Sequence, residues 1–119
     1  MRAIILSDME TDVERVLIDH ILKKEHGYDS RLVTAEDKLY DALETEQFDV
    51  AVIHATTNPD WENTAFRIRS ATQIPIYAIH GIMDKDKPAL PRMLEEQNIQ
   101  FSNYGGIDKF GEWLEEHKK

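Results

Sequence analysis

The sequence contains no cysteine, no long apolar run and no cluster of lysine and arginine. Without cysteine, disulfide bonds, thiolate metal sites and cysteine nucleophiles are excluded. No stretch approaches the roughly 18 consecutive apolar residues of a membrane-spanning helix, and the first apolar run is too short for a signal peptide. We therefore expect a cytoplasmic protein that makes no membrane contact.

Basic residues are also outnumbered by acidic ones. Lys and Arg number 14 against 23 Asp and Glu, which gives a net charge of −9, and the cations form no basic stripe. Binding to nucleic acid requires clustered cations to neutralise phosphates, so nucleic acid is not expected as a direct partner.

Glycine is missing from the loop after the first apolar run. Positions 7–12 read SDMETD, which is acidic and would repel phosphate. Loops that bind nucleotide phosphates use glycines, hydroxyls and backbone N–H groups. The Rossmann fingerprint, the P-loop and an FMN phosphate loop are therefore not supported, and we expect no cofactor.

What is present is a regular alternation of short apolar runs and longer amphipathic segments. The 119 residues, 41% of them hydrophobic and 31% charged, are enough for one domain spanning residues 1–119. The runs predict five strands, at 3–6, 31–35, 50–53, 74–79 and 99–104. The longer segments predict five helices, at 11–26, 36–47, 62–72, 89–97 and 107–117.

Strands that alternate with helices predict an α/β fold with a parallel sheet, because the helices supply the crossover connections. We expect a single five-stranded, doubly wound, flavodoxin-like sheet in the order 2-1-3-4-5, with about five helices. In such folds functional groups gather at the carboxyl ends of the strands. Six residues are expected at that edge: Ser7, Asp8, His54, Thr56, His80 and Tyr104.

The size, the five repeated units and the spacing of these strand ends resemble the receiver domain of bacterial response regulators. Receivers carry two adjacent acids after the first strand, which hold magnesium, and here the pair is Ser7 and Asp8. His54 stands where receivers have the phosphoacceptor aspartate, in "FDVAVIHATTNPDW". His80 takes the place of the switch hydroxyl, and Tyr104 falls near the place of the lysine that ends the fifth strand.

The resemblance implies a degenerate form, a pseudo-receiver. Phosphoryl transfer needs a nucleophilic carboxylate, a divalent cation held by hard oxygen ligands and a cation to stabilise charge. We therefore expect a phosphorylation-independent signalling or regulatory module related to two-component systems, without enzymatic activity. It is expected to act by contact with another protein or domain, or as a homodimer.

The resemblance also implicates the segment 89–113 in contact, because receivers signal and dimerise through the corresponding elements. Aromatic residues are favoured anchors of interfaces. The candidates are Phe101, Tyr104, Phe110 and Trp113, with Trp61 either a packing residue or part of a separate docking patch.

An alternative is a small metal-binding protein or metal-dependent enzyme. Two imidazoles and a carboxylate, from His54, His80 and Asp8, are ligands that suit zinc and similar ions. Such histidines can equally be neutral and hydrogen-bonded in a polar cleft, and a nearby carboxylate would make them sensitive to pH. An inert structural domain is a third possibility.

Overall fold

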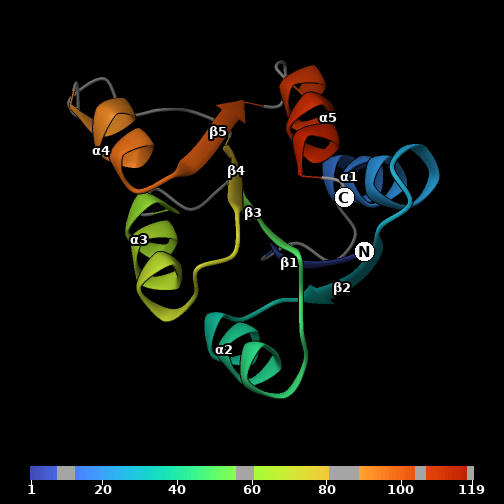
Figure 1. Cartoon of the computed structure of the whole chain (residues 1–119), viewed down its shortest axis with the longest axis horizontal. Helices are drawn as coiled ribbons and strands as arrows, with labels where there is room; N and C mark the ends of the chain where they lie inside the picture. The colour runs from blue at the N-terminus through green and yellow to red at the C-terminus, as the bar shows by residue number, and fades with distance from the viewer. Residues whose placement is uncertain (8–12, 56–60, 81–88, 104–106, 118–119) are drawn as a thin grey trace.

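The strands assemble into one parallel sheet with helices on both faces (Figure 1). The computed structural model describes residues 1–7, 13–55, 61–80, 89–103 and 107–117. The strand order is β2-β1-β3-β4-β5, so the expected fold class and order are confirmed. The strands are β1 (Arg2–Ser7), β2 (Asp29–Val33), β3 (Val50–Ala55), β4 (Ile76–His80) and β5 (Ile99–Asn103).

Helices fill every connection between consecutive strands, and one more helix follows the last strand. In chain order they are α1 (Val13–His20), η1 (Ile21–Glu25), α2 (Glu36–Thr45), α3 (Trp61–Ala71), α4 (Leu90–Glu96) and α5 (Ile107–Glu116). The single α-helix expected at 11–26 instead changes to a π-helical turn, η1, which carries the buried residues Ile21 and Leu22. The wider π turn adds a residue per turn, and it brings two consecutive apolar side chains into the core.

Each face of the sheet has its own apolar core. We call one the α3 face, covered by α2, α3 and α4, where Leu39, Ala65 and Leu94 are buried. We call the other the α5 face, covered by α1, η1 and α5, where Ile18 and Phe110 are buried. Central strands buried on both sides must be apolar throughout, which explains the continuous runs in β1, β3 and β4.

Two positions in the connections require unusual backbone angles. Gly27 has φ of 71° between η1 and β2, and Asn98 has φ of 58° between α4 and β5. Glycine adopts positive φ without steric cost, and asparagine tolerates it better than most residues. The turn at Asn98 lies beside a hollow of the surface. Within the described ranges, no helix is long and apolar enough to cross a membrane.

Candidate functional site

The carboxyl ends of β1, β3 and β4 bring three polar side chains into the interior. Ser7, His54 and His80 are exposed by 0%, 2% and 6% respectively. This edge is where doubly wound folds usually bind ligands. Outside the described residues lie the other three positions expected here: Asp8, Thr56 and Tyr104.

Ser7 and His54 form a buried hydrogen-bonded pair on the α5 face. The two residues are directly paired in the register of β1 and β3, and Ser7 Oγ lies 2.9 Å from His54 Nδ1. A hydroxyl and a neutral imidazole can each donate or accept, so this contact needs no net charge. Neither group is a carboxylate. The end of β3 therefore offers no nucleophile of the kind that forms an acyl phosphate.

The same pair has the geometry of a nucleophile beside a general base. A serine hydroxyl within hydrogen-bond reach of an imidazole can be activated for attack. Here the two residues are 0% and 2% exposed, so a substrate does not reach the Ser7 hydroxyl in this conformation. The pair therefore lies in the packed interior at the end of the strands.

His80 is held by aromatic rings on the α3 face. Its ring stacks on Trp61, with centroids 4.9 Å apart and planes 5° from parallel, and Phe101 lies at 6.1 Å. Its Nδ1 is buried and has no hydrogen-bond partner among the residues that the structure describes. Burial lowers the pKa of His80 below its ordinary value of 6.5, because desolvation disfavours the charged ring. The His80 ring is therefore neutral near pH 7, and it packs as a largely apolar group.

The two histidines do not share a cleft, which corrects the arrangement expected from their positions at neighbouring strand ends. His54 pairs with Ile79, whereas His80 pairs with Ala55, one residue further along β3. Side chains alternate between the faces of a sheet, so this offset places the two rings on opposite faces. The hydrogen bond of His54 to Ser7 and the stacking of His80 on Trp61 agree with that assignment.

A metal centre built on both histidines is therefore not favoured. In the described part of the chain, no group of three or more His, Asp or Glu residues is placed to hold an ion. The magnesium ion of receivers does not fit what is described of this site either. Magnesium prefers hard carboxylate and water oxygens, whereas Ser7 and His54 present a hydroxyl and an imidazole that bond each other.

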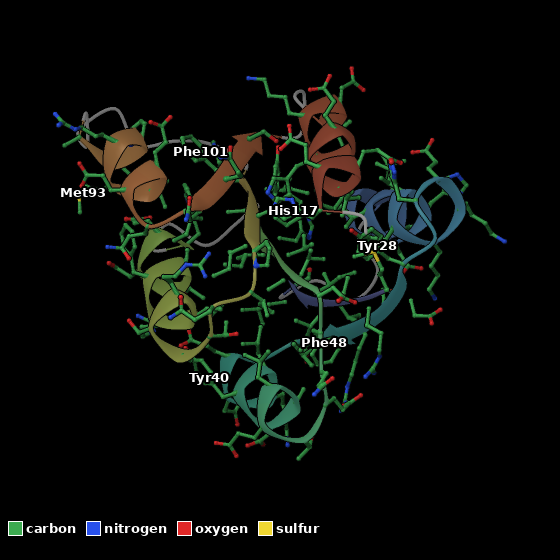
Figure 2. The ribbon with its side chains drawn as sticks, in the orientation of Figure 1. Tyr28, Tyr40, Phe48, Met93, Phe101 and His117 are labelled. Atoms are coloured by element: carbon green, nitrogen blue, oxygen red, sulfur yellow. The ribbon has the colours of Figure 1, made fainter. Side chains whose placement is uncertain are left out.

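Two of the aromatic residues expected at an interface lie in the core instead. Phe110 and Trp113 are exposed by only 0% and 6%, so neither projects from the surface as an anchor, and Trp61, at 3%, is a packing residue, which was one of its two expected roles. The first two pack against Tyr77, with ring centroids 5.1 and 5.2 Å away. Phe101 remains only partly buried on β5 (Figure 2), which keeps it as a contact candidate.

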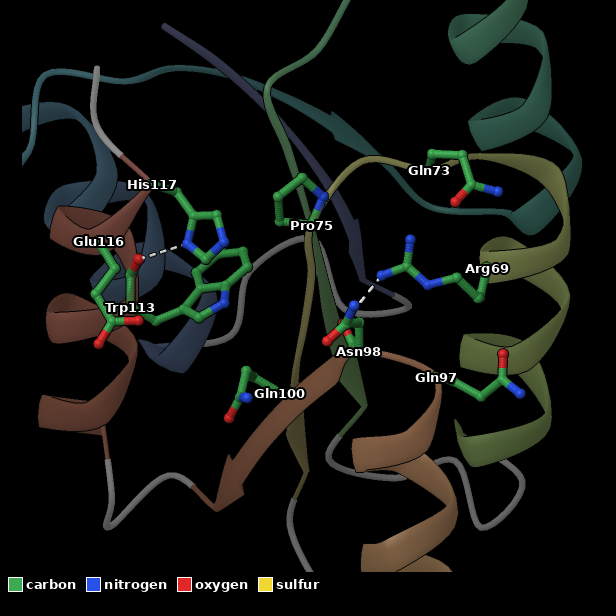
Figure 3. Close-up of a pocket in the computed structure, with 9 residues that line it drawn as sticks. All are labelled: Arg69, Gln73, Pro75, Gln97, Asn98, Gln100, Trp113, Glu116 and His117. Atoms are coloured by element: carbon green, nitrogen blue, oxygen red, sulfur yellow. Dashed lines mark hydrogen bonds between the residues drawn. The ribbon is translucent and has the colours of Figure 1, made fainter.

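A hollow at the opposite, amino-terminal edge of β4 and β5 was not found from the sequence. Its volume is about 290 Å³, and it is bounded by Arg69 on one side and by Trp113 and His117 on the other (Figure 3). The Arg69 guanidinium donates to the carbonyl oxygens of Ile74 at 2.9 Å and Asn98 at 3.0 Å. Burial lowers the pKa of Arg69, because the charged group is partly withdrawn from water.

A second hollow continues the first along β5. Its volume is about 300 Å³, and it lies between β5 and α5, where it is bounded by Lys109 and Glu112. Both hollows are lined by Gln100, Trp113 and Glu116, so they adjoin each other at these residues. We call the two hollows together the β5 groove. The only sequence signal for it was the position of β5 at the end of the strand order.

No protein-family model and no curated protein sequence matches this chain. Solved structures do match its fold. The receiver domain of NtrC4 from Aquifex aeolicus superposes with a TM-score of 0.71 at 16% identity, covering 98% of this chain and 94% of that one. A fusion that contains a trimeric coiled-coil segment of yeast Spc42 gives a TM-score of 0.70 at 13% identity, covering 97% and 76%. The chain therefore has the receiver fold over nearly its whole length.

Proposed function

We propose that this chain is a receiver-like regulatory module that acts by contact with another protein and does not depend on aspartyl phosphate. The observation that carries the proposal is His54, which stands at the end of β3 and bonds Ser7 in the interior. On this proposal the domain is a degenerate receiver, without enzymatic activity, related to two-component signalling.

The chemistry at the ends of β1 and β3 supports independence from phosphate. An acyl phosphate requires a carboxylate that solvent and a phosphodonor can reach, together with a divalent cation. The imidazole of His54 is 2% exposed and already makes a hydrogen bond to Ser7. Of the two positions that hold the acids in receivers, Ser7 carries a hydroxyl.

The edge of the sheet at β5 supports contact as the mode of action. β5 is the last strand of the order, so its outer backbone groups face away from the sheet. Phe101 is partly open at this edge, and Tyr104 follows the strand. We propose that Tyr104 contributes to this surface, and that replacing it by alanine weakens association by at least about 1 kcal/mol while the domain stays folded.

The phosphorylation half of the proposal is tested with acetyl phosphate and with beryllofluoride, each in the presence of magnesium. Intact-mass spectrometry should show no gain of one phosphoryl group, and beryllofluoride should leave the amide spectrum unchanged. A phosphorylatable receiver domain treated in parallel confirms that the reagents work. A stoichiometric phosphoryl gain that maps to an aspartate of this chain would overturn the proposal.

A further inference from the structure

The two edge strands of the sheet differ in how they are protected. Edge strands commonly carry charged side chains that discourage pairing with another strand. At one edge, β2 carries Asp29 and Arg31, both exposed, and Arg31 forms an ion pair with Glu46. At the other edge, β5 reads IQFSN and has no charged residue and no proline. Of the two edge strands, β5 is therefore the one better suited to pair with a further strand.

The β5 groove gives such a strand a place for its side chains. One of its hollows, of about 300 Å³, lies between β5 and α5, and the other, of about 290 Å³, lies at the amino-terminal edge of β4 and β5. Side chains on one side of an extended chain recur about every 6.6 Å, so neighbouring hollows suit successive side chains on that side. Trp113 lines both hollows and offers an apolar wall to the stems of those side chains.

The charge beside β5 determines which partner fits. The two helices that flank this strand, α4 and α5, carry six acidic side chains and two basic ones. The acids are Glu95, Glu96, Asp108, Glu112, Glu115 and Glu116, and all of them are exposed. A second copy of this chain would bring the same acidic flank and be repelled, whereas a basic segment would be attracted.

Two of these acids border the groove itself, together with the cations Lys109 and Arg69, the latter donating to the carbonyls of Ile74 and Asn98. Glu112 and Glu116 lie one helical turn apart on α5, and both line the hollow beside Tyr77. Neither carboxylate has an ion-pair partner in the portion of the chain described by the structure. Cationic side chains of a bound segment would supply one.

We propose that the β5 groove binds an extended, lysine- or arginine-rich segment of another protein, which adds to the sheet as a sixth strand beside β5. Main-chain hydrogen bonds to β5 would provide the pairing, and Glu112 and Glu116 would select basic side chains. The inference rests on the proposed function, since it names the partner for a contact surface that the proposal places at β5.

The test uses the full chain labelled with ¹⁵N and three capped eight-residue peptides. The first alternates lysine and valine, the second alternates glutamate and valine, and the third is the lysine peptide with two prolines in place of alternate residues. The lysine peptide should shift the amide signals of β5 and α5 and bind at least tenfold more tightly than the glutamate peptide. The proline peptide should lose at least tenfold in affinity, because proline cannot donate to the β5 backbone.

The charge argument is tested with the double variant Glu112→Lys, Glu116→Lys. It should reverse the preference, so that the glutamate peptide binds more tightly than the lysine peptide. The matched control is Asp41→Lys, Glu44→Lys on α2, which makes the same change in net charge at two exposed positions away from the groove. The control should keep the preference for lysine.

Several results would overturn the inference: no shift at β5 with the lysine peptide at millimolar concentration, equal binding of the proline peptide, or an unchanged preference in the groove variant. Sedimentation that shows a dimer closing β5 would assign the edge to a second copy instead. These outcomes are independent of the acetyl phosphate experiment, so the inference and the phosphate independence can fail separately.

Discussion

His54 and His80 are the same residue type on neighbouring strands, yet the sheet gives them opposite surroundings. On the α5 face, His54 Nδ1 bonds the Ser7 hydroxyl at 2.9 Å. On the α3 face, the His80 ring stacks on Trp61, and its Nδ1 has no hydrogen-bond partner among the described residues. One imidazole acts as a polar group and the other as an aromatic surface. The difference arises from a register offset of one residue, because a single step along a strand reverses the face.

The largest effect that we expect is on the free energy of unfolding, when one phenylalanine on each face of the sheet is replaced by alanine. Phe110 is completely buried on the α5 face, whereas Phe101 is only partly buried on the α3 face. Phe110→Ala should lower the free energy of unfolding by about 3–5 kcal/mol, since it deletes a ring from a close-packed core. Phe101→Ala should cost less than half as much.

Urea denaturation of both variants checks this prediction. Phe110 was expected from the sequence to be an interface anchor, which would make its removal nearly neutral for the isolated chain. A loss below about 1 kcal/mol for Phe110→Ala would restore that expectation and contradict the packing of Phe110 against Tyr77.

The fold could be predicted from the sequence because each central strand, buried on both faces, appears as a continuous apolar run. The apolar run at 50–53 located β3, for example, since a strand covered on both faces has no polar side. The edge strand β2 was placed two residues late, at 31–35 rather than Asp29–Val33. Exposed Asp29 and Arg31 interrupt its pattern, so the local sequence does not show where pairing begins.

The site could be predicted only in part. Ser7, His54 and His80 were located at strand ends, but the side of the sheet on which each lies depends on the register between strands. Local sequence does not encode that register. The contact of Arg69 with the carbonyl of Asn98 joins residues 29 positions apart, and it likewise has no local signal. The expected cluster of His54 and His80 failed for this reason.

The second prediction concerns the polar pair on the α5 face. His54→Ala should lower the free energy of unfolding by about 1–3 kcal/mol, because it removes a buried hydrogen bond and leaves a small cavity. Ser7→Ala and the double variant complete a cycle that isolates the contact. The coupling between the two residues should be about 0.5–1.5 kcal/mol. Additive effects of the two substitutions would show that the 2.9 Å contact contributes nothing to stability.

The third prediction uses pH to distinguish the histidines. Because burial lowers the pKa of His80 below 6.5, the unfolded chain binds a proton more readily than the folded chain does. Well above pH 6.5 both states are neutral at this position, and the group has no effect on stability. As the pH falls below 6.5 towards the lowered pKa, stability should decrease.

The decrease is assigned to His80 by comparison with His80→Phe. Urea denaturation at several values between about pH 5.5 and 7.5 should give a shallower loss of stability for the variant than for the natural chain. His54→Ala, measured over the same range, should retain the slope that His80 causes. Identical slopes in the natural chain and in His80→Phe would place the acid sensitivity at another group.

The smallest effect should come from His80→Phe at pH 7.5, where the free energy of unfolding should change by no more than about 1 kcal/mol. Phenylalanine keeps an aromatic ring of similar size against Trp61 and Phe101, and it removes the buried Nδ1 that has no described partner. On the other face, His54→Phe should cost more than this, because the substitution removes the hydrogen bond to Ser7. His80→Ala serves as the control for the ring itself and should cost at least about 2 kcal/mol, since the stack on Trp61 is lost. If His80→Phe were as costly as His54→Phe, the imidazole nitrogens of His80 would be needed for folding, and the two faces would treat their histidines alike.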